Sequence, residues 1–301
     1  MGGSLTLDYK TPPRLLTQYP KVFLARRPRL VPDGESAGRI EGRVVTCRAA
    51  RRNLGAYRQA CGFQADGHLP VTYPHVLATS LHLGMLTSKA FPVRLPGLIH
   101  KQNRIIQWRP IPEGDSFSLF AWLEGYRATR LGQEFELTTD VLLGGERVWQ
   151  ESATLLARGP NRKPSDMRSA TPAAPKSAAP TDAILFRTRA NTGRRYARVS
   201  GDFNPIHLFG WSARLFGLPT PIAHGMWSLA RCCAELITET QGVKATFSCD
   251  FKRPVPLPAK LRLERARIPA GLSFMLCSED GNRLHLAGVI EPKVKPGFDS
   301  P

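Results

Sequence analysis

The residues best suited to do chemistry lie in the run YARVSGDFNPIH, from Tyr196 to His207. Within it, Asp202, Asn204 and His207 bring an acid, an amide and an imidazole close together along the chain. A carboxylate and an imidazole that meet on one water molecule can share general base and general acid work, and each such proton transfer accelerates a reaction by roughly 10²- to 10⁴-fold. A plain surface turn is the other interpretation, because Gly, Asp, Asn and Pro are common loop residues.

The local sequence predicts how these side chains are placed. Asn204 is a favoured residue type for capping a helix N-terminus, and Pro205 is favoured as the first helical residue. A helix that begins here places His207 in its first turn, beside Asp202. The amide of Asn204 then either positions a water molecule or only stabilises the turn.

The run resembles the signature of the R-specific enoyl-CoA hydratases and MaoC-like dehydratases. The matching positions are Tyr196, Ser200, Gly201, Asp202, Asn204, Pro205, Ile206 and His207, with Ala213 as the small residue expected further on. The segment IAHGM, residues 222–226, is also similar to the family. The resemblance implies reversible hydration of trans-2-enoyl thioesters, or dehydration of (R)-3-hydroxyacyl thioesters, in fatty acid metabolism.

The resemblance also implies a division of labour. Asp202 and His207 would hold one water molecule, remove its proton as it attacks the β-carbon, and return a proton to the α-carbon on the same face. No cofactor and no metal ion is expected. Coenzyme A or phosphopantetheine enters only as part of the substrate.

A donor for the thioester oxygen is expected at Gly225. The first N–H groups of a helix that starts there have no partner within the helix, and the helix dipole is positive at that end. The backbone N–H of Gly225 can therefore stabilise the negative charge that develops on the oxygen, although a turn that needs glycine would explain the residue equally. We expect His224 to fix this turn, and a contact with substrate remains open.

The net charge of +18 raises the question of an anionic partner. No run of five or more basic residues and no recognisable nucleic-acid module is present, so we expect no nucleic acid partner. An acyl-CoA or an acyl carrier protein thioester fits this charge, and solubility alone also explains it. Lys252 and Arg253 are candidate contacts for the phosphates of the carrier, with a solvated strand end as the alternative.

The elements that must position these residues occur twice. Residues 161–180 are rich in Pro, Ala and Ser, which predicts a linker between an N-terminal domain, 1–160, and a C-terminal catalytic domain, 181–301. In the first half a helix is expected after Pro74, and in the second half a helix is expected to start near Gly225. Strands follow the helix in each half. The expected strands are 99–108, 117–123, 135–143 and 148–156 in the first half, and 245–251, 261–268, 272–277 and 284–290 in the second.

This repeated order predicts an α+β fold in which each antiparallel sheet wraps round one helix. Two such halves can join their sheets edge to edge as a pseudo-dimer, which removes two exposed edges. The fold expected for the resembled family is the double hot dog.

The two halves differ at the site. An offset of 139 residues aligns Gly62 with Gly201 and His68 with His207, but Phe63 then stands where the carboxylate should be. His68 is therefore expected to be a loop or packing residue, and we predict one active site per chain, in the C-terminal half.

The degenerate half is free to accept a long or bulky acyl tail. Leu77, Leu81 and Met85 would line that space or belong to the core, and their helical spacing favours the core.

Compartment and association are less constrained. The six cysteines show no metal-binding spacing and are expected to be reduced packing residues. No apolar run approaches the roughly 20 residues of a membrane span, and the N-terminus lacks the pattern of a secretion signal, so a cytoplasmic location is expected. A homodimer remains open, and residues 1–45 receive no firm role.

Three other functions compete with hydration. A hot dog thioesterase would hydrolyse the thioester, and hydrolysis does not need the acid, amide and imidazole of this motif. A non-catalytic acyl-thioester-binding subunit would keep the site as a relic, which the intact Asp202 and His207 disfavour. An RNA-binding protein would show salt-dependent retention on nucleic acid.

Overall fold

The computed structural model describes residues 4–24, 27–159, 182–237 and 244–292. The predicted linker, 161–180, lies outside the described residues.

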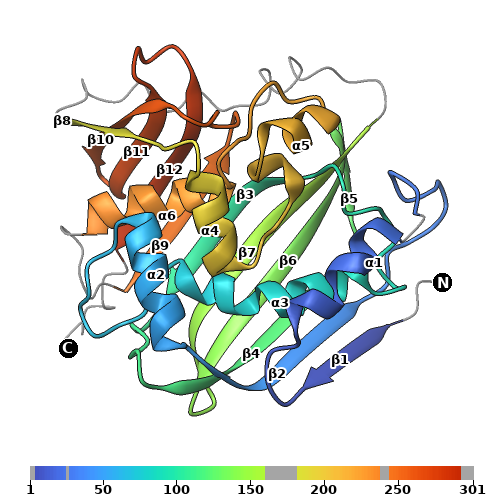
Figure 1. Cartoon of the computed structure of the whole chain (residues 1–301). Coiled ribbons are helices and arrows are strands. Elements are labelled where there is room, and N and C mark those ends of the chain that lie inside the picture. The colour runs from blue at the N-terminus through green and yellow to red at the C-terminus, as the bar shows by residue number, and fades with distance from the viewer. Residues whose placement is uncertain (1–3, 25–26, 160–181, 238–243, 293–301) are drawn as a thin grey trace.

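One sheet of 12 strands spans both halves of the chain (Figure 1). Its strand order is β1-β2-β4-β6-β7-β3-β9-β12-β11-β10-β8, and β5 pairs with β6. All neighbours are antiparallel except β1 and β2. The strands are β1 (Leu5–Tyr9), β2 (Ile40–Arg48), β3 (Leu98–Gln107), β4 (Ser116–Leu123), β5 (Arg127–Thr129), β6 (Gly132–Leu143), β7 (Glu146–Arg158), β8 (Asp182–Arg187), β9 (Ala245–Phe251), β10 (Lys260–Ile268), β11 (Gly271–Ser278) and β12 (Leu284–Pro292).

The two halves meet where β3 pairs with β9. Ile105 stands opposite Phe247 in this ladder, and the Gln102 side chain donates a hydrogen bond to Asp250 at 2.6 Å. The predicted joining of the two sheets edge to edge is therefore confirmed, and the pairing satisfies backbone groups that would otherwise form two open edges.

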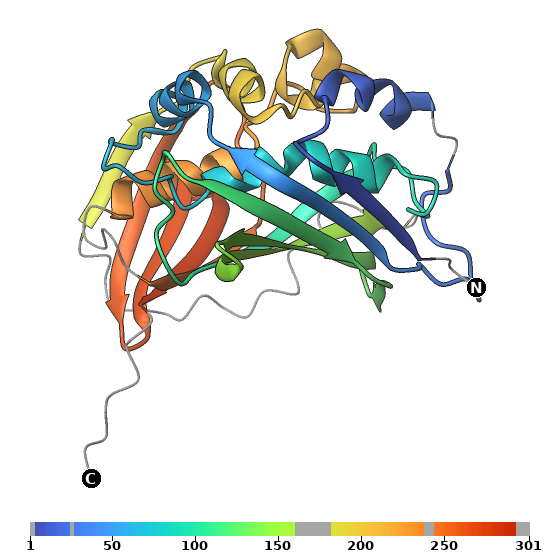
Figure 2. The same cartoon turned by 90° about the horizontal axis from the view of Figure 1, so that it is seen from below.

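The helices lie on one face of the sheet, as Figure 2 shows from below. The long helices α3 (Tyr73–Thr87) and α6 (Gly225–Leu236) lie against the first and second halves of the sheet, and α2 (Arg51–Cys61) contacts α4 (Thr192–Ser200). The shorter elements are the 3₁₀ turns η1 (Leu15–Thr17) and η3 (Pro205–His207) and the helices α1 (Tyr19–Leu24) and α5 (Gly210–Leu215). All eight predicted strands and the helices predicted after Pro74 and near Gly225 are present, whereas β1, β2, β5 and β8 were not predicted.

Helix α3 is anchored in the core by one of its faces. Leu81 and Met85 are 0% and 1% exposed, and Leu77 is partly buried against the same core. A Cβ atom placed on Gly42 of β2 would lie only 2.7 Å from Leu81 Cδ1, so glycine at this position lets the helix approach the strand closely. The interpretation of these three residues as core is confirmed.

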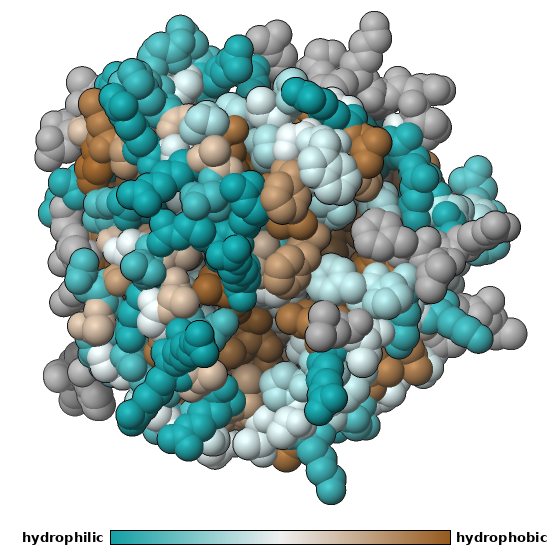
Figure 3. Space-filling view, viewed as in Figure 1, coloured by the Kyte–Doolittle hydropathy of each residue, from teal (hydrophilic) through white to brown (hydrophobic). Residues whose placement is uncertain are grey.

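The cysteines, the helices and the surface on the helix side also bear on the predictions made for the whole chain. All six cysteines are free and buried, as predicted for packing residues. Among the described residues, no helix has the length and apolar character needed to cross a membrane. Viewed from the helix side, apolar residues are exposed near the middle of the face, with hydrophilic residues around them (Figure 3).

Candidate active site

The loop that carries the candidate acid and base, residues 201–207, begins where α4 ends at Gly201, and we call it the catalytic loop. This glycine has a φ of +76°, in the left-handed region that favours glycine. A Cβ atom on it would lie 2.3 Å from Leu15 Cδ1, so a larger residue would also require the Leu15 side chain to move. Leu15 of the N-terminal segment therefore packs directly against the start of the loop.

The residues that follow form two nested turns. Asp202 Oδ1 accepts the backbone N–H of Asn204 at 3.1 Å, and Asn204 Oδ1 accepts that of Ile206 at 3.4 Å. Asn204 caps η3, as predicted, although the helix is a single 3₁₀ turn. This turn brings His207 back toward Asp202.

His207 is nearly buried, with 8% of its surface exposed. Its Nδ1 lies 2.8 Å from the carbonyl oxygen of Ile222. A carbonyl oxygen only accepts, so Nδ1 carries the proton and Nε2 keeps a free lone pair in the neutral ring. Burial lowers the pKa of His207 and outweighs the opposing charge of Asp202, which favours this neutral form.

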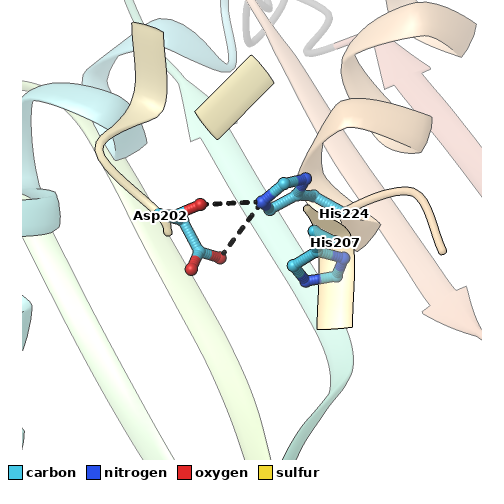
Figure 4. A group of neighbouring side chains, drawn as sticks. All are labelled: Asp202, His207 and His224. Atoms are coloured by element: carbon cyan, nitrogen blue, oxygen red, sulfur yellow. Dashed lines mark hydrogen bonds and ion pairs between the residues drawn. The ribbon is translucent and has the colours of Figure 1, made fainter. Parts of the chain in front are cut away.

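His224 stacks on His207 and contacts the catalytic loop (Figure 4). The two ring centroids are 3.6 Å apart, and His224 Nε2 lies 3.0 Å from the main-chain oxygen of Asp202 and 3.7 Å from its Oδ2. Burial, followed by the proximity of His207, lowers the pKa of His224 to about 3. A neutral His224 that donates from Nε2 therefore holds the Asp202 loop, which is a different segment from the turn at Gly225 that the sequence led us to expect.

Asp202 keeps 47% of its side chain exposed. Burial acts to raise its pKa, but His224, His207 and the N–H of Asn204 outweigh that effect and hold the pKa below its usual range. An ionised carboxylate therefore stands beside a neutral imidazole. The ligand-type atoms of Asp202, His207 and His224 lie within 4.8 Å of one another, so this group can surround one water molecule and has the spacing to hold a metal ion.

A cavity of about 480 Å³ connects these groups. Every residue singled out from the sequence as a site residue borders it, namely Asp202, Asn204, His207, His224, Gly225, Lys252 and Arg253. Gly225 is the first residue of α6, and the predicted helix start is confirmed. Lys252 pairs with Asp250 at 2.7 Å and Arg253 is exposed, so their role toward carrier phosphates stays a prediction.

Tyr19 borders the cavity and was not anticipated. Its hydroxyl donates to the carbonyl oxygen of Gly201 and accepts the backbone N–H of Phe203 at 2.7 Å. Its ring also meets that of Phe203 edge to face, with centroids 5.9 Å apart. Nothing in the sequence signals this contact, because Tyr19 stands outside any motif and 182 positions before Gly201.

The alignment of His68 with His207 is wrong. His68 forms an isolated bridge with Pro112, and its structural counterpart is Ile222, which forms the same kind of bridge with Pro256. The segment that contains α5 has no counterpart in the first half, so a constant offset fails beyond it. His68 is not among the residues that border the large cavity.

Comparison with known proteins agrees with this geometry. Residues 170–270 match the family model described as a MaoC like domain. The 3-hydroxyacyl-thioester dehydratase X of Mycobacterium tuberculosis is 32% identical over 238 residues, which are 79% of this chain and 84% of that protein.

Solved structures show the same fold. The crystal structure of HtdX from Mycobacterium tuberculosis has a TM-score of 0.73 at 29% identity and covers 84% of this chain and 100% of its own. A second protein of Mycobacterium tuberculosis, described as having a double hot dog fold, has a TM-score of 0.51 at 13% identity over 82% of this chain and 93% of its own. The chain therefore belongs to the MaoC-like dehydratase family and has the double hot dog fold.

Proposed function

We propose that this MaoC-like hydro-lyase hydrates trans-2-enoyl thioesters reversibly to (R)-3-hydroxyacyl thioesters through Asp202 and His207. The observation that carries the assignment is the state of the His207 ring. Its Nδ1 is committed to the carbonyl oxygen of Ile222, which leaves Nε2 as a free base, and ligand-type atoms of His207 and Asp202 lie within 4.8 Å of each other. Such a pair can orient one water molecule and accept its proton.

Asp202, His207 and the backbone N–H of Gly225 can carry out every proton transfer and charge stabilisation that hydration requires. Water loses a proton to His207 Nε2 while its oxygen bonds to the β-carbon of the substrate. The negative charge that reaches the thioester oxygen is stabilised by the backbone N–H of Gly225, at the N-terminus of α6. The Asp202 and His207 pair returns a proton to the α-carbon, and the double bond becomes a single bond.

Loss of the enoyl-thioester absorbance, with crotonyl-CoA and a long-chain enoyl-CoA, tests this function. We expect Asp202→Asn and His207→Ala to lower turnover by roughly 10²- to 10⁴-fold, because each removes one proton-transfer partner. Chiral analysis should identify the (R)-3-hydroxyacyl product, and a metal chelator should leave the rate unchanged.

His68→Ala is the matched control, since it removes a histidine that lies outside the cavity. It should retain wild-type turnover. Release of free thiol without a hydrated product would instead identify a thioesterase, and no turnover of CoA or carrier-protein thioesters by wild type would favour a non-catalytic binding subunit.

We also propose a phosphate-bearing carrier for the acyl group, and the oligomeric state and cellular location need tests of their own. The basic pair Lys252 and Arg253 at the cavity supports a phosphate-bearing carrier such as coenzyme A or phosphopantetheine. Sedimentation analysis tests the possible homodimer, and cell fractionation tests the cytoplasmic location expected from the sequence.

A further inference from the structure

A second group of titratable side chains borders the same cavity from the N-terminal half. His75 and His82 project from α3 and His100 comes from β3. Behind them, Glu151 and Asn103 are each only 1% exposed. The chemistry assigned to Asp202 and His207 uses none of these five residues, which we call the second polar cluster.

The cluster is organised by hydrogen bonds to Glu151. His75 Nδ1 lies 2.8 Å and 2.9 Å from the two carboxylate oxygens, and the Asn103 side chain donates to one of them at 2.6 Å. His82 Nε2 lies 2.7 Å from Thr139 Oγ1. Within the described residues, Nε2 of His75 has no hydrogen-bond partner, and this residue borders the cavity.

The charges inside the cluster are set by burial and by these contacts. Burial acts to lower the pKa of His75, but Glu151 and Asp202 outweigh it and raise the pKa. Burial acts to raise the pKa of Glu151, yet the neighbouring His75 lowers it to about 2. Burial, followed by the proximity of His75, lowers the pKa of His82 to about 3 and that of His100 to about 4. Within the cluster, the protonated form is therefore favoured most at His75, which faces the Glu151 carboxylate, whereas His82 and His100 favour the neutral form.

A buried ion pair such as that of His75 and Glu151 is not an efficient way to stabilise the fold. Apolar residues of similar volume often stabilise a buried position as well as an ion pair does, or better, because charges lose solvation on burial. Helix α3 already has an apolar anchor in Leu81 and Met85 on its other face. Perturbed titratable groups in the wall of a cavity point to a functional site instead.

The position of the cluster along α3 indicates what it meets. The residues of α3 that border the cavity are His75, Thr79, His82, Leu83 and Leu86, which lie along one side of the helix. At 1.5 Å per residue this stripe is about 16 Å long. The stripe is polar at the His75 end and apolar at the Leu86 end. The charge of Asp202 raises the pKa of His75, so the polar end is the one that senses the candidate active site.

We propose that the second polar cluster is a binding subsite for a neutral oxygen, a hydroxyl or carbonyl group, that the acyl chain carries between its reacting carbons and an apolar tail. The inference rests on the proposed function. A protonated His75 that donates from Nδ1 to Glu151 offers its Nε2–H to such an oxygen. An anionic substituent fits less well, because Glu151 and Asp202 already place two carboxylates near one cationic ring.

Binding of unreactive thioesters tests the subsite separately from turnover. The probes are phosphopantetheine thioesters of one saturated chain of medium length, with and without a single mid-chain keto or hydroxyl group moved along it carbon by carbon. Phosphopantetheine is the arm common to both carriers, and calorimetry gives the dissociation constants. For at least one position of the oxygen, wild type should bind the substituted chain about tenfold more tightly, as expected for a hydrogen bond to a charged group.

Two variants assign that preference to the cluster. His75→Phe removes the donor, and Glu151→Gln removes the charge that favours its protonation while nearly preserving volume, so both should bring the ratio of the two dissociation constants close to one. Leu86→Ala is the matched control at the apolar end of the same stripe. It should weaken both chains and retain their ratio.

The proposal is overturned if wild type binds oxygenated and plain chains equally at every position tested, or if it binds neither. A preference that survives in both His75→Phe and Glu151→Gln also overturns it. Because saturated thioesters cannot be hydrated, a failure of the hydratase assignment appears only in the enoyl-thioester assay.

Discussion

At the scale of single residues, the site depends on keeping two imidazoles neutral beside one carboxylate. His207 donates from Nδ1 to a main-chain oxygen, and His224 donates from Nε2 to another. Each contact selects one tautomer, so the reactive nitrogen of His207 is defined by a carbonyl group and needs no acidic side chain for that purpose. Asp202 remains free to act on water.

The pH dependence of turnover should reflect these states. His207 acts as a base only when neutral, and its pKa lies below the ordinary value of 6.5. The value of kcat/KM should therefore stay level through neutral pH and fall only as the pH drops through that lowered pKa, which a profile from about pH 4 to pH 8 would record.

Asp202→Asn should move this acidic limb further down. The charge of Asp202 raises the pKa of His207, so its removal leaves the opposing effect of burial uncompensated in the residual activity. A limb that moves to higher pH in this variant would contradict the assignment of His207 as the base.

At the scale of elements, the N-terminal segment supports the catalytic loop. Tyr19 bridges Gly201 and Phe203 on either side of Asp202, and Leu15 occupies the space that a side chain at Gly201 would need. We therefore expect the segment to influence catalysis through the position of the loop.

Tyr19→Phe should lower kcat by about tenfold and change KM little, because a misplaced catalytic group mainly loses rate. Steady-state kinetics with a long-chain enoyl-CoA would show this split. Tyr126→Phe is the control, since that hydroxyl contacts Glu35 at the surface. A rise in KM at unchanged kcat would instead place Tyr19 in substrate binding.

The elements also show how far the sequence could be interpreted. Alternating apolar residues revealed β9, and the motif located η3 and the start of α6, because those signals are local. Strand β2 escaped because Gly42 and a bulge near Cys47 break its alternation, and its pairing with β1 and β4 depends on distant segments. The role of Tyr19 and the second polar cluster arise from such long-range packing, which no spacing along the chain reveals.

At the scale of the whole molecule, the buried histidines should make the fold sensitive to acid. His82, His100 and His224 have pKa values lowered to about 3, about 4 and about 3. Below the ordinary pKa of 6.5, the unfolded chain binds protons that the folded chain does not. The stability that depends on these three neutral histidines is fully present above pH 6.5. It is lost as the pH falls toward their pKa values in the folded protein.

We expect the free energy of unfolding to decrease below pH 6.5 by about 1.4 kcal/mol per pH unit for each such histidine. Denaturant titrations at several pH values would measure the slope. His82→Gln, which can still contact Thr139, should reduce the slope by one histidine's share, and an unchanged slope would show that His82 does not remain neutral in the folded protein.

The junction of β3 and β9 has a consequence for how this site can evolve. In a pair of identical subunits, every substitution appears twice and must suit both copies of a site. Here the two halves share one sheet but have separate codons, so a change at His75 leaves its counterpart in the second half untouched. The first half can thus diverge toward a new acyl group while the second keeps its acid and base, and selectivity and chemistry become independently adjustable traits of one polypeptide.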